Sequence, residues 1–214
     1  MESLFDASDG GENREERLAE LARQVAVCTR CDLSLNRTNT VFGSGDPTSP
    51  LMLIGEGPGE NEDATGLPFV GRAGKLLDDI LAAVDLSRDQ VYLTNVVKCR
   101  AANEEGGRLK NRPPKTAEAN ACNPYLQGQL EAIKPEVILC LGGPAAKTII
   151  DKNFRITKDR GQWHEVHGAK TMATFHPAYV LRQHGEDLQQ TKRLVWKDIQ
   201  AVYAEYQKAM EKRG

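Results

Sequence analysis

The stretch "LMLIGEGPGENEDATGLPFVG", from Leu51 to Gly71, decides the fold class and raises the question of what the protein binds. Its first four residues are apolar and of strand length, and a glycine-rich turn follows, as at the end of a strand in an α/β fold. The turn lacks the third glycine of a dinucleotide-binding loop, and no Gly-Lys-Ser/Thr follows it. It carries four carboxylates instead: Glu56, Glu60, Glu62 and Asp63. Because carboxylates repel a phosphate, we expect a neutral, flat ligand with polar edges at this turn.

Three more apolar runs of strand length follow along the chain, and segments with a helical pattern separate them. We expect strands at Leu51–Ile54, Val91–Val97, Val137–Leu141 and Thr171–Phe175, and helices at about Arg14–Val27, Gly71–Val84, Thr116–Ile133, Pro144–Ile150 and Glu186–Lys212. This alternation predicts an α/β fold with a mostly parallel sheet that helices cover on both faces. In such folds ligands bind beyond the carboxyl ends of the strands, so the residues near those ends are the candidates for function.

Length and composition are those of one sizeable globular domain. The chain has 214 residues, of which 40% are hydrophobic and 27% are charged. Residues 1–13 are polar and glycine-rich and are expected to be disordered, which leaves residues 14–214 for the domain. No apolar run approaches the roughly 20 residues that span a bilayer, and no signal peptide is visible at the start. The sequence therefore predicts a cytoplasmic protein that does not enter a membrane and in which disulfides are disfavoured.

The net charge of −2 hides an uneven distribution. An acidic segment opens the chain, whereas the segment from Lys98 to Lys115 carries six basic residues against two acidic ones, Glu104 and Glu105. Such a group of cations is typical of a surface that binds nucleic-acid phosphates, but a solvated loop has the same composition. Both interpretations stay open on charge alone.

Five cysteines are present, and two of them, Cys28 and Cys31, form the motif "CTRC". Two intervening residues allow both thiolates to bind one metal centre. Cys140 lies in the apolar run "EVILCLGG" and is most simply a buried small hydrophobic residue. Cys99 and Cys122 remain to complete a set of four, and both lie near basic residues that stabilise thiolates. A redox pair at "CTRC" is the alternative, and spacing does not distinguish zinc from an iron–sulfur cluster.

Three further candidates lie near the ends of the predicted strands or in the turns after them. Phe69, between Pro68 and Val70, is either a core residue or a platform on which a base stacks. Asn95, in "LTNVVKC", offers one acceptor and two donors in one plane, which match a base edge that presents an N–H beside a carbonyl. His176, in "HPAYVLR", is a candidate proton donor or charge stabiliser. For each of them an ordinary structural role is the alternative.

Taken together, these motifs resemble the family 4 uracil-DNA glycosylases, the iron–sulfur branch of the uracil-DNA glycosylase superfamily. The resemblance rests on "VCTRC", "GEGPGENEDATGLPFVGRAGKLL", "YLTNVVKCR", "CNPY" and "HPAYVLR", in that order, between about Arg14 and Tyr206. It implies a three-layer αβα fold with a central four-stranded parallel sheet. It implies hydrolysis of the N-glycosidic bond between uracil and deoxyribose, which leaves an abasic site. It also implies a [4Fe–4S] cluster, which we expect to be structural, on Cys28, Cys31, Cys99 and Cys122.

The resemblance further implies a uracil pocket formed by six residues: Glu56, Gly57, Glu62, Phe69, Asn95 and His176. Phe69 is then expected to stack on uracil, and Asn95 to pair with N3–H and O4, which cytosine does not match. Glu62 is the expected wall against the methyl group of thymine. Glu56 is expected to orient or deprotonate a water, or to stabilise the developing sugar cation, while His176 stabilises charge on uracil O2.

The segment that follows His176 is expected to enter the DNA. Val180 or Leu181 would fill the gap that the extruded base leaves, with core packing as the alternative for both. Arg182, with basic residues between Lys98 and Lys115, would hold phosphates and make binding depend on salt. The expected partner is uracil-containing DNA, double- or single-stranded, bound by a monomer, and a sliding clamp is a conceivable further partner.

Two other functions compete with the turnover of uracil-DNA. One relative of the family captures uracil covalently on a histidine in the loop that corresponds to residues 100–121, but this chain has no histidine there. Its four histidines are His164, His167, His176 and His184. The other competitor is a four-cysteine DNA-binding module without catalysis. That module would leave unexplained why several polar and aromatic residues recur at successive strand ends.

Overall fold

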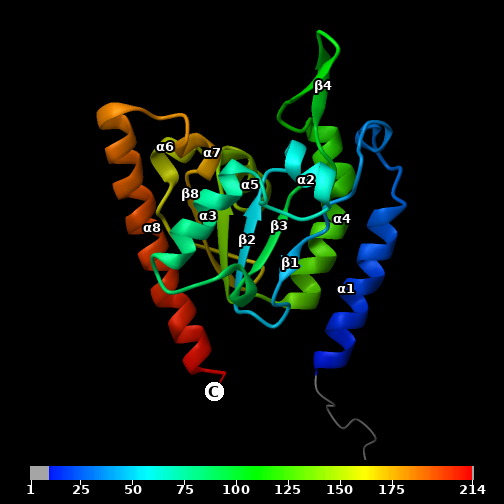
Figure 1. Ribbon diagram of the computed structural model, residues 1–214. Helices are drawn as coiled ribbons and strands as arrows, with labels where there is room; N and C mark the ends of the chain where they lie inside the picture. Colours follow the sequence, from blue (N-terminus) through cyan, green and yellow to red (C-terminus); the bar gives the residue numbers. More distant parts are fainter. Residues whose placement is uncertain (1–9, 214) are drawn as a thin grey trace, which may run out of the picture.

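The computed structural model describes residues 10–213 and has three layers, with a six-stranded sheet between two groups of helices (Figure 1). The strand order in this sheet is β1-β3-β2-β6-β8-β7. Its four central strands are parallel: β3 (Tyr92–Asn95), β2 (Leu51–Gly55), β6 (Val137–Leu141) and β8 (Ala169–Thr174). The α/β class and the four parallel strands expected from the sequence are therefore confirmed.

Four short strands were not expected, and they correct the strand count. β1 (Ser44–Gly45) and β7 (His164–Val166) pair antiparallel with β3 and β8 and so form the two edges of the main sheet. A separate antiparallel hairpin consists of β4 (Ala102–Glu105) and β5 (Arg108–Asn111). Its turn is Gly106–Gly107, where φ is 61° and 75°, a conformation that glycine adopts without steric cost.

The five longer helices expected from the sequence are present, with ends that shift by a few residues. They are α1 (Gly10–Ala26), α3 (Arg72–Ala82), α4 (Thr116–Ile133), α5 (Gly143–Ile149) and α8 (Gly185–Glu211). Short helices not expected are α2 (Glu60–Thr65), α6 (Ile156–Asp159) and α7 (Pro177–Val180), with the 3-10 turns η1 (Asp32–Leu35) and η2 (Arg88–Gln90). α1 begins at Gly10, four residues before the expected start at Arg14. The disorder expected for residues 1–13 stays a prediction, and residues 1–9 lie outside the described part. None of the helices in residues 10–213 combines the length and apolarity that a membrane crossing requires.

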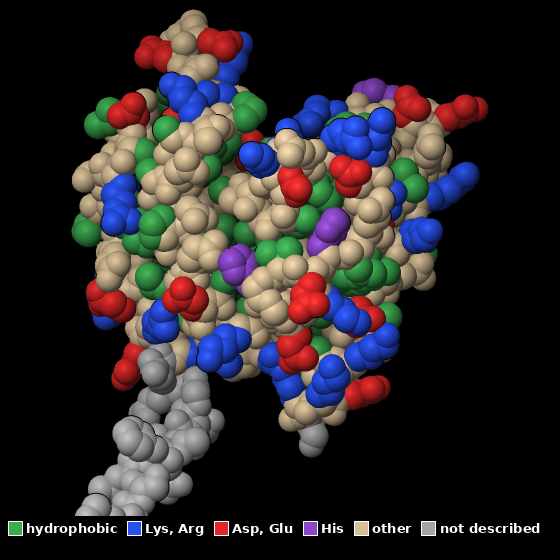
Figure 2. Space-filling model, turned by 180° about the vertical axis from the view of Figure 1, so that it is seen from behind, with side chains coloured by type: hydrophobic (Ala, Val, Ile, Leu, Met, Phe, Trp, Pro, Cys, Tyr) green, Lys and Arg blue, Asp and Glu red, His purple; other side chains and the backbone are tan. Residues whose placement is uncertain are grey.

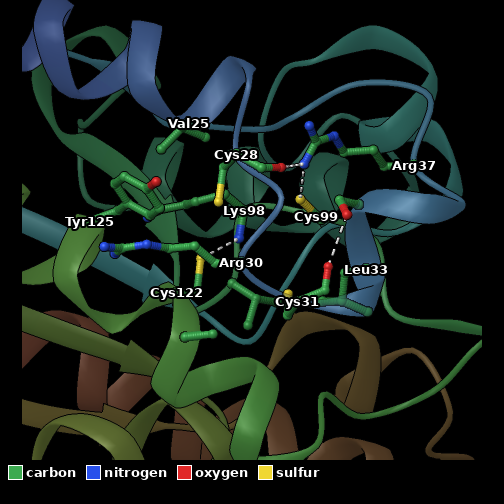
Figure 3. Close-up of a pocket in the computed structure, with 13 residues that line it drawn as sticks. Val25, Cys28, Arg30, Cys31, Leu33, Arg37, Lys98, Cys99, Cys122 and Tyr125 are labelled. Carbon is green, nitrogen blue, oxygen red and sulfur yellow. Dashed lines mark hydrogen bonds between the residues drawn. The ribbon is translucent and has the colours of Figure 1, made fainter.

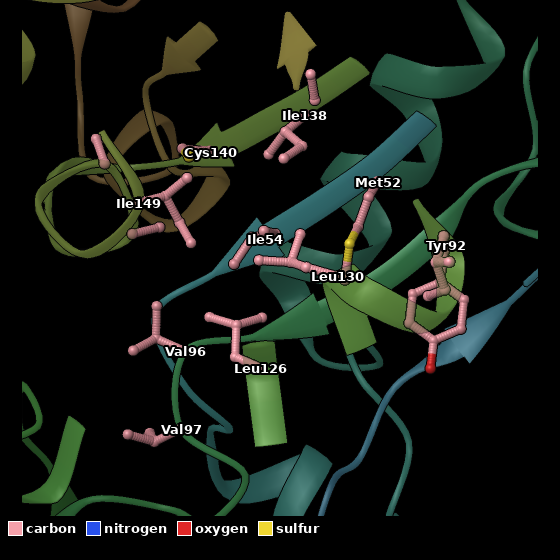
Figure 4. Packing of buried hydrophobic residues seen from close by; sticks show 14 of the residues in the cluster. Met52, Ile54, Tyr92, Val96, Val97, Leu126, Leu130, Ile138, Cys140 and Ile149 are labelled. Atoms are coloured by element: carbon pink, nitrogen blue, oxygen red, sulfur yellow. The ribbon is translucent and has the colours of Figure 1, made fainter. Parts of the chain in front are cut away.

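The sheet buries both of its faces because successive residues of a strand point to opposite sides. In β2, Met52 and Ile54 pack in a cluster with residues of α1, α4 and α5, part of which Figure 4 shows. Leu51 and Leu53 pack on the other face with residues of α3 and α8. Cys140 of β6 is fully buried in the first cluster, so its expected role as a small hydrophobic residue is confirmed.

The parallel arrangement brings the functional candidates to one edge. The carboxyl ends of β2 and β3 are in register, with Gly55 opposite Asn95, and the turn after β8 begins at the same edge. The β4–β5 hairpin projects from this end of the molecule (Figure 1). The loop after β2, the end of β3 and the turn after β8 therefore lie around one point in space.

Candidate functional site

A cleft of about 590 Å³ opens beyond the carboxyl ends of the strands. It is bounded by the loop after β2, by α2, by the start of α3, by α7 and by the base of the β4–β5 hairpin. All six expected pocket residues line it: Glu56, Gly57, Glu62, Phe69, Asn95 and His176. The chain thus gathers into one cavity side chains that lie up to 120 positions apart in the sequence.

Two polar atoms in this cleft are buried and have no hydrogen-bond partner among the described residues, Glu56 Oε1 and Asn95 Oδ1. The Asn95 residue is only 2% exposed. Native proteins rarely leave a buried polar atom unpaired, because each one costs about 1–3 kcal/mol. Unpaired atoms that line a cleft are therefore atoms that meet a ligand or water when the site is in use.

Phe69 lies in the cleft with a strained main chain. Its φ of 54° is in the left-handed region, which non-glycine residues seldom adopt and which concentrates at functional sites. Arg88 donates a hydrogen bond to the Phe69 carbonyl at 2.9 Å. A Cβ on Gly74 would lie 1.7 Å from the same oxygen, so only glycine allows this approach. The residue is 5% exposed and belongs to the core cluster against α3 and α8, so it is both a core residue and part of the cleft wall.

The glycines of the loop after β2 leave space for the cleft. A Cβ on Gly55 would lie 2.4 Å from Asn95 Oδ1 and 2.6 Å from Phe69 Cζ. A Cβ on Gly57 would lie 2.7 Å from Val97 Cγ2. Both distances at Gly55 are too short for a real side chain, so the gap between Asn95 and Phe69 depends on the absence of one there.

Glu62 lines the cleft, but main-chain N–H groups occupy its carboxylate. Oε1 accepts hydrogen bonds from Val70 and Gly71, both at 2.9 Å, and Oε2 accepts one from Gly59 at 3.1 Å. The carboxylate therefore holds together the loop that carries Phe69. A glutamate three residues after a helix N-cap is the sequence signal for this arrangement, and it was available in "GENE". Its expected position beside the ligand and its loop-holding role are compatible.

His176 presents one ring nitrogen to the protein and keeps the other for a ligand. Its Nδ1 accepts a hydrogen bond from the Ala178 main-chain N–H at 3.0 Å, so in the neutral ring the proton is on Nε2. Burial lowers the pKa of His176 to about 4; the positive charge of Arg182 contributes further and Glu62 partly opposes it. At neutral pH this imidazole is therefore an uncharged N–H donor.

Glu56 is a cleft carboxylate whose pKa is perturbed. Burial raises its pKa above the usual value, and the charge of Arg182 partly opposes the rise. Arg182 lines the same cleft and acts on both Glu56 and His176. The site therefore combines a desolvated carboxylate, a neutral imidazole and the cation of Arg182. Because Arg182 lowers both pKa values, it favours the ionised form of Glu56 and the neutral form of His176.

The segment after His176 corrects one of the expected wedge residues. Val180 is 3% exposed and packs with Phe175 and Val195 in a third core cluster. It is therefore not placed to enter a base stack. Leu181 is 38% exposed and precedes Arg182, which lines the cleft, so it alone keeps the wedge role as a hypothesis.

The basic segment from Lys98 to Lys115 is partly engaged within the protein and partly exposed to solvent. Four of its six basic side chains are engaged within the described part of the protein: Lys98, Arg100, Lys110 and Arg112. Arg112 pairs with the buried carboxylate of Glu118 at 2.6 Å, and this bond braces the base of the hairpin. The hairpin itself carries side chains of both signs, as the projection at the top of Figure 2 shows. Its contribution to phosphate binding stays a prediction.

Four cysteines surround one small cavity (Figure 3). Cys28 follows α1, Cys31 precedes η1, Cys99 follows β3 and Cys122 lies in α4. The Lys98 main-chain N–H donates to Cys122 Sγ at 3.3 Å. A second donor, the guanidinium of Arg37, lies 3.4 Å from Cys99 Sγ. Donors in these positions stabilise thiolates that bind metal.

The four sulfurs lie around the cavity, as Figure 3 shows. Within residues 10–213, no three His, Cys, Asp or Glu side chains lie close enough together to hold a single metal ion. Burial raises the pKa of Cys122 to about 11 and also raises that of Cys99. These two thiols therefore keep their protons at neutral pH unless a metal displaces them.

The chain is similar to several proteins of one family. The sequence model described as "Uracil DNA glycosylase superfamily" matches residues 42–200. A type-4 uracil-DNA glycosylase of Thermotoga maritima is 44% identical over 191 residues, which cover 87% of this chain and 93% of that protein. A type-4 uracil-DNA glycosylase of Archaeoglobus fulgidus is 43% identical over 174 residues, or 78% of this chain and 84% of that one. A type-5 uracil-DNA glycosylase of Pyrobaculum aerophilum is 27% identical over 151 residues, or 63% of each chain.

Proposed function

The chain belongs to the uracil DNA glycosylase superfamily, and from that premise we propose that it hydrolyses the bond between uracil and deoxyribose in DNA. The single observation that carries the proposal is the pair of unpartnered buried oxygens, on Glu56 and Asn95, in a cleft that Phe69 and His176 also line. A duplex must extrude its base to reach such a cleft. Extrusion costs a few kcal/mol and is least costly for a mispaired base such as uracil opposite guanine.

Recognition of uracil depends on Asn95 and Phe69. The Asn95 Oδ1 accepts the N3–H of uracil, and its amide N–H donates to O4. Cytosine presents an acceptor at N3 and a donor at C4, so it leaves both Asn95 groups unpaired at about 1–3 kcal/mol each. The Phe69 ring stacks on the base. Glu62 fixes the Phe69 loop and borders the position of C5, where a thymine methyl group would collide.

Bond cleavage depends on His176 and Glu56. As the base leaves, negative charge develops on uracil O2, and the neutral His176 ring donates its Nε2–H to that oxygen. A donor already fixed by the Ala178 bond needs no reorganisation at the moment of reaction. Glu56 orients or deprotonates the attacking water, or stabilises the positive charge that develops on the sugar.

The cysteine cavity fits a [4Fe–4S] cluster on Cys28, Cys31, Cys99 and Cys122. In such a cluster each thiolate binds a different iron, so the sulfurs encircle a volume, whereas a zinc ion needs them to converge. Four cysteines of the described residues around one cavity support such a cluster. When bound, the cluster supplies structural cross-linking and not chemistry on the DNA, because it ties α1 to the segment after β3.

The remaining parts of the proposal concern the partner. The protein acts as a single domain from residue 14 onward and as a monomer on double- and single-stranded DNA that contains uracil. Leu181 fills the gap left by the base, and Arg182 holds a phosphate. A sliding clamp stays a hypothesis that no contact in the described residues supports or opposes.

The experiment is release of uracil from an oligonucleotide with one deoxyuridine, placed opposite guanine, opposite adenine or in a single strand. We expect free uracil and an abasic site that alkali cleaves. Asn95→Ala should lower the rate by roughly 100-fold or more, because two hydrogen bonds to the base are lost. Asn153→Ala, at an exposed position on the loop after α5, is the matched control and should leave the rate unchanged. Absence of uracil release by the wild type would reject the proposal.

The same reaction on a denaturing gel distinguishes turnover from covalent capture. Of the four histidines, all within the described residues, only His176 lines the cleft. Its Nδ1 is occupied by Ala178, and the hairpin segment that would carry a capturing histidine has none. We therefore expect no protein–DNA band that survives denaturation. A non-catalytic DNA-binding module would instead bind the oligonucleotide without uracil release, and Asn95→Ala would not change its affinity.

A further inference from the structure

Lys98 is a buried lysine whose position the cleft alone does not explain. Its side chain is 1% exposed. The ammonium donates hydrogen bonds to Thr94 Oγ1 at 2.6 Å, to the Asn95 carbonyl at 2.7 Å and to Gln129 Oε1 at 2.6 Å. All three acceptors are uncharged. Burial lowers the pKa of Lys98 to about 7. A buried amino group without a carboxylate partner is costly, so an apolar residue would be favoured here unless the three bonds hold something in place.

The hydrogen-bond pattern fixes the direction of each of these bonds. The Thr94 hydroxyl lies 2.8 Å from the Phe42 carbonyl and 3.1 Å from Gln129 Oε1, and both of these oxygens only accept. The Thr94 proton therefore points to one of them, and its oxygen accepts from Lys98. Lys98 supplies all three protons, so its Nζ is held at three points. The bond from Lys98 Nζ also fixes the position of the Asn95 carbonyl.

The main chain of Lys98 bonds to a different part of the protein. Its N–H donates to Cys122 Sγ, as Figure 3 shows, and its carbonyl accepts from Val41 at 2.8 Å. The next residue is Cys99, which lines the same cavity. One residue thus touches the cysteine cavity through its main chain and the base-reading strand end through its side chain.

We propose that Lys98 is a positioning residue that couples the four-cysteine site to base recognition by Asn95. The inference rests on the proposed function, in which the Asn95 amide reads uracil. Asn95 Oδ1 has no partner within the described residues, so the direction of the amide depends on the main chain that carries it. Lys98 holds that main chain at its carbonyl. Occupation of the cysteine site fixes the Lys98 main chain and so orders the amide before the base arrives.

A double-mutant cycle tests this coupling. Lys98→Met keeps the length of the side chain and removes all three donors. We expect it to lower kcat/KM for uracil opposite guanine by roughly 10- to 100-fold, the usual effect of losing a hydrogen bond from a charged donor. In an Asn95→Ala background the same change should have almost no effect, because its target is already gone. Losses that multiply would overturn the proposal.

Gln129→Met is the matched control within the same buried network. It removes the Gln129 bonds to Lys98, the Thr94 hydroxyl, the Phe42 carbonyl and the Tyr92 hydroxyl, but it does not touch Asn95. We expect it to lower the unfolding midpoint and to combine multiplicatively with Asn95→Ala. Iron and sulfide content, measured on every variant, distinguishes loss of positioning from loss of the cluster. Lys98→Gln, which keeps two donors, should recover part of the excision rate, and no recovery would count against Lys98 as a positioning residue.

A measurement on the wild type keeps the inference testable if a variant does not fold or if the proposed function fails. Amide hydrogen exchange is compared before and after oxidative loss of the cluster, at β3 and at β6. We expect residues 94–97 to lose protection before Val137–Leu141, since only the former are tied to the cavity through Lys98. Equal loss in both strands would contradict the coupling, whatever the outcome of the uracil assay.

Discussion

Replacement of Gly55 by alanine tests whether the gap between Asn95 and Phe69 is the place of the base. The new Cβ would lie 2.4 Å from Asn95 Oδ1, whereas ordinary van der Waals contact begins at 3.4 Å, so the amide must retreat by the difference of about 1 Å or the ring must move. A misplacement of about 1 Å at a site of this kind lowers the rate on the order of 100-fold. We therefore expect Gly55→Ala to lower the rate of uracil release about 100-fold while the fold persists.

The assay is single-turnover release of uracil from a duplex with uracil opposite guanine, with thermal unfolding measured on the same preparation. Gly143→Ala is the control. It lies at the same edge of the sheet, after β6, and its Cβ would meet Ile156 Cβ at 3.7 Å, which is ordinary contact. We expect the control to keep both rate and stability. If Gly55→Ala released uracil within about threefold of the wild-type rate, the base would not occupy this gap.

Three further predictions follow from the site and the cysteine cavity. The pKa of His176 is lowered to about 4, so between about pH 6.5 and 4 the unfolded chain binds more protons than the folded one. This residue therefore makes the free energy of unfolding fall as pH falls, by roughly 2 kcal/mol after allowance for its partial exposure. Urea unfolding at pH 7 and pH 4.5 should show a loss larger by that amount in the wild type than in His176→Asn, and equal losses would contradict the buried neutral ring. Arg182→Ala should reduce the slope of log affinity against log salt by about one unit, as loss of one phosphate contact does, and an unchanged slope would remove Arg182 from the DNA interface. Cys99→Ala should lose visible iron–sulfur absorbance, stability and activity together. The control, Cys140→Ala, should keep the absorbance. A colourless wild type that contains zinc would reject the cluster.

The sequence predicts the central layer of this fold because its strands are buried on both faces. Val137–Leu141 is an uninterrupted apolar run, and its observed bounds are those expected. The edge strands β1 and β7 gave no such signal, since Ser44–Gly45 and His164–Val166 are short, partly polar and formed only by pairing with β3 and β8. Tertiary pairing of this kind overrides local preference.

The β4–β5 hairpin was missed for a different reason. Its Gly106–Gly107 turn is a recognised hairpin signal, but the flanking residues are charged and do not alternate with apolar ones. Charge composition left a phosphate-binding surface and a solvated loop both open, and the structure engages four of the six cations in internal bonds. Composition alone does not reveal which cations have partners.

The candidate site was predictable for residues whose place in the fold follows from a sequence motif. It was less predictable for residues whose role depends on the direction of the side chain. Phe69, Asn95 and His176 follow from their places near strand ends, and they line one cleft. Val180 and Leu181 are neighbours with similar chemistry, yet one is buried and the other exposed, because α7 turns them to different sides. Lys98 gave no signal in the sequence, since its significance lies in three acceptors that come from two separate elements.

The short edge strands of the main sheet affect how the protein associates at high concentration. β1 and β7 contain two and three residues, so each border offers a second chain little unpaired backbone along which to extend a ladder. The long apolar strands lie inside, out of reach of such growth. The main sheet therefore offers little edge at which strand-to-strand association between two copies can begin.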